Sequence, residues 1–156
     1  MSHPSHPAGI DPAARSRARR RALQAIYAWQ MSGNRVDNVI EQFRHEQDMQ
    51  IADLEYFEQI VRGVVRLHEE LDAAIVPFLD REVERVDPIE RAALRIAAWE
   101  LRERVDVPYR VVINEAVEAT KRFGAGEVAR VEVRSIDEVG QLAGSFNSMV
   151  EAIEDR

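Results

Sequence analysis

The 156-residue sequence contains no cysteine, and its longest apolar runs are only a few residues. The absence of cysteine excludes disulfides, thiolate metal sites and a cysteine nucleophile, and it is compatible with a reducing compartment. The short apolar runs exclude a membrane-spanning helix, and the opening MSHPSHPAGIDP lacks the apolar stretch of a secretory signal. We therefore expect a cytoplasmic protein without a membrane association.

The sequence also lacks the common signatures of catalysis. It has no glycine-rich phosphate loop, no G-x-S-x-G and no H-E-x-x-H motif. Its four histidines (His3, His6, His45 and His68) are scattered, and its many carboxylates fall on the outer faces of the expected helices. We therefore expect no enzymatic activity, no metal site and no cofactor.

A cluster of arginines stands out against the rest of the composition. The chain has 46% apolar and 31% charged residues, as an ordinary globular domain has, and a formal net charge of -7. Residues 14–21 nevertheless contain five arginines and no acid: Arg15, Arg17, Arg19, Arg20 and Arg21. A basic end on an acidic body favours a directed electrostatic contact over general polyanion binding. A solvated helix end is the alternative.

The hydrophobic pattern has the period of helices, and period-2 alternation is not convincing before residues 128–133. Asp11 followed by Pro12, and Asp87 followed by Pro88, are typical helix starts. The expected helices cover about residues 11–32, 36–46, 53–71, 87–101 and 108–124, and the fold class is all-α. Pro77 predicts a bend or boundary, and Gly124 the end of the last of these helices. Gly63 inside the third helix predicts a close helix crossing.

Four segments, in this order, resemble the NusB family of bacterial transcription antitermination factors: RRRALQAIYAWQMSGN, YFEQIVRGV, DPIERAALRIAAWEL and DVPYRVVINEAVEATKRFGA. The resemblance extends over about residues 13–125. It implies two packed three-helix bundles in one all-α domain at residues 11–125, the N-terminal bundle at about 11–80 and the C-terminal bundle from about 84. Residues 1–10 have no periodicity and are expected to form a disordered tail.

The resemblance also implies a function. Members of the family bind the boxA element of nascent RNA together with NusE, a small-subunit ribosomal protein, and join the elongating RNA polymerase, chiefly on ribosomal RNA operons. Arg15, Arg17 and Arg19 match the positions at which the family contacts RNA. Arg20 and Arg21 add charge where other members often have an acid or an apolar residue. Guanidinium groups suit this task because they pair with phosphate and stack on bases.

The resemblance further implies a surface for NusE. By similarity, Tyr27, Glu84 and Glu90 are candidates for that contact, and the acidic remainder of the chain suits a basic ribosomal protein. The alternatives are that Tyr27 lies at the edge of the core and that Glu90 only completes the cap of its helix. The oligomeric state is open, since some members form a homodimer through the surface that others use for partners.

The C-terminal residues 126–156 depart from the family, which normally ends in a helix containing KFVNG. Residues 135–153 resemble the second helix of a HAMP signalling module instead. Apolar residues there follow a heptad-like spacing: Val139, Leu142, Phe146, Met149 and Ile153. We expect an atypical amphipathic helix from about Ile136 to Glu154 that partly docks on the domain, because its apolar stripe would otherwise be exposed.

Two other functions compete with antitermination. A NusB-like RNA-binding domain also stands at the front of some ribosomal RNA methyltransferases, and the chain would then be a truncated form without the catalytic domain. A helical interaction module that binds only protein is the second alternative. Specific RNA binding separates that module from the antitermination factor.

Overall fold

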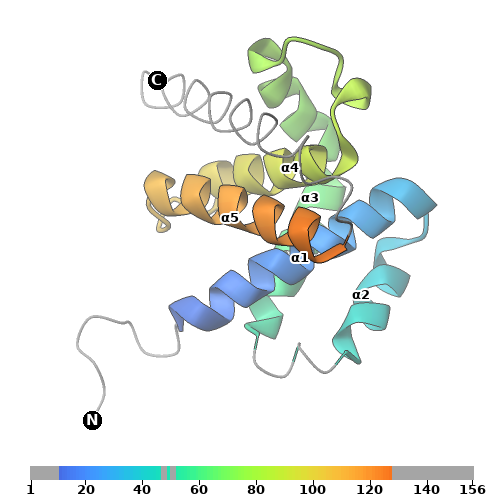
Figure 1. Ribbon diagram of the computed structural model, residues 1–156, viewed down its shortest axis with the longest axis vertical. Coiled ribbons are helices and arrows are strands. Elements are labelled where there is room, and N and C mark those ends of the chain that lie inside the picture. The colour runs from blue at the N-terminus through green and yellow to red at the C-terminus, as the bar shows by residue number, and fades with distance from the viewer. Residues whose placement is uncertain (1–10, 47–48, 50–51, 128–156) are drawn as a thin grey trace.

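The computed structural model describes residues 11–46, 49 and 52–127, with side chains described up to Phe123. This part of the chain contains five α-helices and no strand (Figure 1). The α-helices are α1 (Pro12–Ser32), α2 (Val36–Arg44), α3 (Leu54–Ile75), α4 (Pro88–Glu103) and α5 (Tyr109–Glu127), and two short 3₁₀ helices are η2 (Val76–Phe78) and η3 (Val83–Arg85). The all-α prediction is confirmed. None of the described helices combines the length and apolarity that a membrane crossing requires.

The helix starts lie where the sequence predicts them. The Asp11 side chain accepts a hydrogen bond from the Ala13 amide at 3.0 Å, and the Asp87 side chain accepts one from the Ile89 amide at 2.9 Å. Each bond satisfies an amide that has no partner within the first turn of its helix. At the other end of α1, Gly33 has a φ of 70°, a conformation that favours glycine. These local signals determine where α1 begins and ends and where α4 begins.

One predicted end is wrong. The helix that the sequence predicts to end at Gly124 continues to Glu127, whereas the predicted domain boundary at residue 125 stays a prediction. A glycine within a helix costs only about 1 kcal/mol relative to alanine, and it ends a helix only when the chain needs a positive φ. Among the described glycines, only Gly33 has a positive φ. Pro77, by contrast, lies in η2 directly after α3, so the predicted boundary there is confirmed.

Helix α1 packs against each of the other four α-helices of the described chain, and α4 lies between α3 and α5 (Figure 1). The buried apolar side chains of all five helices form one core, which includes Leu23 and Ile26 of α1, Ile60 of α3 and Ala97 of α4. The expected division into two three-helix bundles stays a prediction. Both the expected tail at residues 1–10 and the expected helix at 136–154 lie outside the described residues.

The predicted close crossing is confirmed at Gly63, where α3 meets α4. Gly63 is buried beneath the Trp99 indole, and a Cβ atom placed on Gly63 would lie 2.6 Å from Trp99 Cε2 and still nearer to Nε1. Any larger residue would therefore displace the indole or separate the two helices. Helix α4 also contributes small buried residues, Ala93 and Ala97, which let its neighbours approach closely.

Candidate anion-binding site

The arginines at the start of α1 lie on two sides of the helix. Because an α-helix has 3.6 residues per turn, Arg17, Arg20 and Arg21 share one face with Gln24. Arg15 and Arg19 lie on a different face, toward α3 and α4. The first group borders an open pocket, and the second contacts buried side chains. One basic stretch of sequence therefore forms two different environments.

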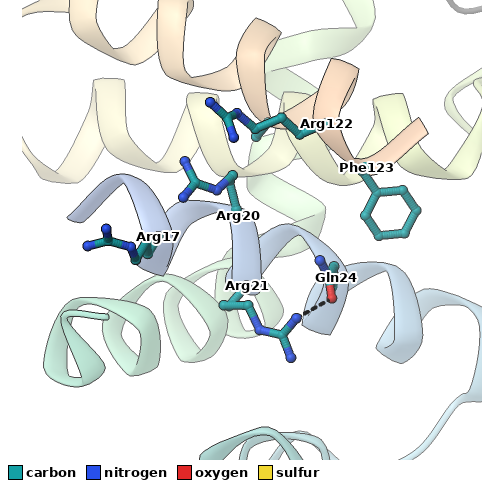
Figure 2. Close-up of a pocket in the computed structure, with 7 residues that line it drawn as sticks. Arg17, Arg20, Arg21, Gln24, Arg122 and Phe123 are labelled. Carbon is teal, nitrogen blue, oxygen red and sulfur yellow. Dashed lines mark hydrogen bonds between the residues drawn. The ribbon is translucent and has the colours of Figure 1, made fainter. Parts of the chain in front are cut away.

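The pocket lies between α1 and α5 and has a volume of about 340 Å³. It is lined by Arg17, Arg20, Arg21 and Gln24 of α1 and by Ala119, Arg122 and Phe123 of α5. Figure 2 shows the Arg20 and Arg122 side chains extending from these two helices into the same space. Four guanidinium groups and one aromatic ring thus border a single opening. Such a lining of guanidinium groups suits phosphate groups.

Arg20 lies near two other arginines of the pocket, Arg17 and Arg122. Burial lowers the pKa of Arg20 below its ordinary value, and the positive charges of Arg122 and then Arg17 lower it further, whereas Glu115 opposes the change. Arginine nevertheless keeps its proton at neutral pH. The pocket therefore concentrates positive charge that a bound anion would neutralise.

Arg21 is only partly available to the pocket. Its guanidinium pairs with Glu46, donates a hydrogen bond to Gln24 Oε1 at 2.7 Å, and lies over the Phe43 ring with its Cζ 5.2 Å from the ring centroid. These contacts hold the side chain along the surface of α1 toward the end of α2. Arg21 is consequently a weaker candidate for an anion contact than its place at the pocket suggests.

Arg19 lies in the core, bound to a carboxylate of α4. Only 6% of Arg19 is exposed, and its Nε and Nη2 donate hydrogen bonds to the Glu100 carboxylate at 2.9 Å each. Burial alone would lower the pKa of Arg19, but the hydrogen bond and charge of Glu100 raise it above its ordinary value. The pairing with Glu100 occupies the Nε and Nη2 side of the guanidinium. The structure therefore places Arg19 in the core, bound to Glu100, and the RNA contact predicted for it stays a prediction.

Arg15 lies beside the same buried group. Its Cζ is 4.2 Å from the centroid of the Tyr56 ring, and its Nε is 3.7 Å from Asp53 Oδ2 at the start of α3. The side chain is 15% exposed. Most of Arg15 thus packs on α3, and the predicted RNA contact through its exposed part stays a prediction.

Sequence reasoning missed Arg122, Gln24 and Phe123. The pocket joins positions about one hundred residues apart in the chain, and no local pattern indicates that α5 would bring Arg122 to the start of α1. The available signals were a Lys-Arg pair near the end of α5 and the helical spacing of Gln24 from Arg17 and Arg20. Both became informative only with the packing of α5 on α1.

The three candidates for a protein contact lie on neighbouring elements. Tyr27 is half-buried on α1, where its ring packs on the Phe123 ring with 5.3 Å between centroids. Glu84 is exposed in η3, and Glu90 is in the first turn of α4. Gln30, one turn after Tyr27, donates a hydrogen bond to the Pro88 carbonyl at 2.9 Å and so joins the end of α1 to the start of α4.

Comparison with known proteins gives matches over most of the chain. The sequence model described as the NusB family matches residues 16–131. The transcription antitermination protein NusB of Xanthomonas oryzae pv. oryzae is 63% identical over 125 residues, which are 79% of this chain and 80% of that protein. The transcription antitermination protein NusB of Xanthomonas axonopodis pv. citri is 65% identical over 117 residues, which are 75% of this chain and 74% of that protein.

Two solved structures have the same fold. A crystal structure of the antitermination factors NusB and NusE in complex with dsRNA superimposes with a TM-score of 0.74 at 21% identity, over 91% of this chain and 99% of that chain. A crystal structure of a plectonemic RNA supercoil gives a TM-score of 0.73 at 21% identity, over 88% and 94%. The HAMP domain model matches residues 113–155, so the HAMP-like sequence expected at 135–153 is found.

Proposed function

The chain belongs to the NusB family, and we propose that it acts as a transcription antitermination factor that binds RNA at the arginine pocket between α1 and α5. The prediction that the chain is not an enzyme is confirmed by its family membership. The observation that supports the RNA site is the convergence of Arg17, Arg20 and Arg122 on one opening. Guanidinium groups pair with phosphate oxygens through two parallel hydrogen bonds, which makes such a convergence selective for a nucleic acid backbone.

The proposed RNA is boxA in nascent ribosomal RNA transcripts, and the proposed partners are NusE and the elongating polymerase in the cytoplasm. A protein of the same fold that was crystallised with NusE and dsRNA supports an RNA and a NusE partner. Single-stranded RNA suits the pocket because guanidinium groups can bind its phosphates and stack on its unstacked bases. The same proposal assigns Tyr27, Glu84 and Glu90 to the NusE contact, where the two carboxylates would face a basic protein.

Fluorescence anisotropy of labelled RNA tests the proposal. A boxA-like RNA and a scrambled RNA of equal length are titrated with the protein, with and without NusE, at several salt concentrations. We expect tighter binding to the boxA-like RNA that NusE strengthens further. Arg17→Ala, Arg20→Ala and Arg122→Ala should each weaken binding about tenfold, because each removes a charge-assisted hydrogen bond to phosphate.

Arg62→Ala is the matched control. Arg62 is also an exposed helical arginine, but on α3, where it donates a hydrogen bond to Asp37 at 2.7 Å and does not border the pocket. Equal losses of RNA affinity for Arg62→Ala and the pocket variants would contradict the assignment of the RNA site to the pocket. Such a result would mean that RNA binds only through the general attraction of its phosphates to positive charge. Binding to NusE without a preference for boxA would favour the protein-only interaction module.

A further inference from the structure

The pocket exists only while α5 lies at its present position on α1, because Arg122 and Phe123 come from one helix and Arg17 and Arg20 from the other. Apart from Phe123, the buried α5 residues next to it, Ala116 and Ala119, are small. Small side chains permit a close approach of two helices, but they resist sliding less than large interdigitating side chains do. Polar contacts therefore become important for the register of α5.

Glu115 provides these polar contacts. The Ser16 hydroxyl of α1 donates a hydrogen bond to Glu115 Oε1 at 2.5 Å, and Arg19 Nη1 lies 3.5 Å from the same oxygen. One carboxylate of α5 thus contacts two residues that lie one turn apart on α1. This arrangement resists both sliding and rotation of α5 relative to α1.

The partner of Glu115 is itself held in place. Arg19 is bound by Glu100 of α4, and the Tyr56 hydroxyl of α3 donates a hydrogen bond to Glu100 Oε2 at 2.5 Å. Glu115 therefore connects α5 to a buried group that α1, α3 and α4 fix together. On α5, Arg122 follows Glu115 by seven residues, which is two turns on the same side of the helix. A shift of α5 at Glu115 would move Arg122 by a similar amount.

Glu115 also affects the electrostatics of the pocket. Burial and the charges of Arg122 and Arg17 lower the pKa of Arg20, and the negative charge of Glu115 opposes them. Like charges brought together repel, and a nearby opposite charge reduces the cost. Glu115 is not among the residues that line the pocket, so this effect requires no contact with the bound anion.

We propose that Glu115 is a positioning residue for the arginine pocket, which keeps Arg122 opposite Arg17 and Arg20 through its contacts with Ser16 and Arg19. The inference rests on the proposed function, since the pocket matters only as an anion site. The expected effect of removing Glu115 on RNA affinity is opposite to the usual effect of removing an acid. Removing an acid from a protein ordinarily strengthens its attraction for RNA, whereas removing this acid should weaken RNA binding.

The test compares Glu115→Ala, Glu115→Gln and the control Glu118→Ala by fluorescence anisotropy with the boxA-like RNA across a salt series. Glu118 is an exposed acid on the same helix and lies 3.9 Å from Lys121. We expect Glu115→Ala to weaken binding about tenfold and to reduce the slope of log K against log salt by about one phosphate contact. Glu118→Ala should bind as tightly as the unaltered chain or more tightly. Glu115→Gln should recover much of the loss, because its amide oxygen can still accept the Ser16 hydrogen bond.

The salt slope separates positioning from mere destabilisation. A partly unfolded sample contains fewer active molecules, but those molecules keep the original slope. Circular dichroism melting shows whether each variant is folded at the assay temperature. If Glu115→Ala fails to fold, Ser16→Ala replaces it, since it removes only the hydroxyl and leaves every charge in place. We expect Ser16→Ala to weaken binding about threefold.

Inorganic pyrophosphate, titrated calorimetrically, provides a measurement without RNA. If the unaltered chain binds pyrophosphate but not RNA, the proposed function is wrong. The positioning role is then tested by whether Glu115→Ala binds pyrophosphate more weakly than Glu118→Ala does. Binding of neither ligand would overturn both proposals. A folded Glu115→Ala protein, or the folded Ser16→Ala replacement, that binds as tightly as the unaltered chain with an unchanged slope would overturn the positioning role alone.

Discussion

At the scale of single residues, Arg17 and Arg19 show how two neighbouring arginines acquire unrelated roles. They are two positions apart, which places them about 200° apart around the helix axis. Arg17 borders the pocket, whereas Arg19 is buried against Glu100. Removing one partner of a buried ion pair lowers the free energy of unfolding strongly, because the other charge is left buried without a partner. Loss of Arg19 should therefore lower the stability of the fold, whereas loss of Arg17 should weaken RNA binding.

Arg19→Ala should lower the free energy of unfolding by about 3–5 kcal/mol, because Glu100 would stay buried without its cation. Arg17→Ala should lower it by less, because Arg17 is only partly buried and borders an open pocket. Urea denaturation followed by circular dichroism measures both values. Similar small losses for the two variants would contradict the burial of the Arg19–Glu100 pair.

Tyr56→Phe tests the same group through pH. Burial and the negative charge of Glu100 raise the pKa of Tyr56 above its ordinary value of 10.0. The folded state therefore holds this proton more tightly than the unfolded state does, and the associated stability is complete below about pH 10 and decreases as the pH rises above it. Tyr56→Phe should cost about 1.5–3 kcal/mol at pH 7, the value of a hydrogen bond to a charged group.

The difference between Tyr56→Phe and the unaltered chain should become smaller from about pH 10 upward. Urea unfolding at pH 7, 9 and 10.5 measures this change, and Tyr109→Phe, which alters an exposed tyrosine, is the control. A difference that stays constant over this range would show that the Tyr56 hydroxyl does not interact with Glu100 in the folded protein.

The sequence indicated the arginine cluster but not the separate environments within it. A helical projection distinguishes Arg17 from Arg19, but it does not show which face meets the core. That depends on Glu100, which is 81 residues away in the chain, and on Tyr56 from a third helix. Charged residues are rarely buried unless they are paired, so the burial of Arg19 could be predicted only together with the position of its partner.

At the scale of elements, the crossing of α3 and α4 determines how closely the core packs. Gly63→Ala should lower the free energy of unfolding by about 1–3 kcal/mol, because the added methyl group collides with the Trp99 indole. In a Trp99→Ala background the same change should become neutral or stabilise the protein by about 1 kcal/mol, since alanine favours a helix over glycine. The four proteins form a double-mutant cycle that urea denaturation can measure. Additive effects would contradict the contact.

Local sequence signals predicted where the helices lie better than they predicted which helices contact one another. Asp11 and Asp87 indicated helix starts because a cap depends on a few neighbouring residues. Gly63 indicated a crossing, although the sequence could not identify Trp99 as the other side of it. Gly124 gave a false end because a glycine costs a helix little unless a positive φ is needed. The pocket combines α1 and α5, and its position follows from tertiary packing that no local signal contains.

At the scale of the whole molecule, the pocket is a small basic surface on a chain with a net charge of -7. Four arginines border the pocket, and Arg21 pairs with Glu46, so we expect three or four phosphate contacts. For a single strand each phosphate contact contributes about 0.7 to the salt slope. An increase from 50 to 200 mM salt should therefore reduce RNA affinity about 20- to 50-fold.

Anisotropy titrations at five salt concentrations measure this slope, with Arg122→Ala expected to lower it by about one contact and Arg62→Ala expected to leave it unchanged. A slope twice as large would mean that RNA extends over further cations beyond the pocket. A slope near zero would mean that base contacts, not phosphates, provide the affinity.

The central position of α1 has a consequence for the synthesis of the protein. The ribosome makes α1 before the other described helices, but its buried charge and its apolar face need partners from much later in the chain, since Arg19 binds Glu100 and Ser16 binds Glu115. These pairs lie 81 and 99 residues apart in the chain, and such distant contacts slow folding relative to a bundle of local hairpins. Until α4 and α5 have left the exit tunnel, the arginines and the apolar face of α1 are exposed beside ribosomal RNA. Nascent chains that stop before residue 115 should therefore be the most prone to non-specific RNA binding.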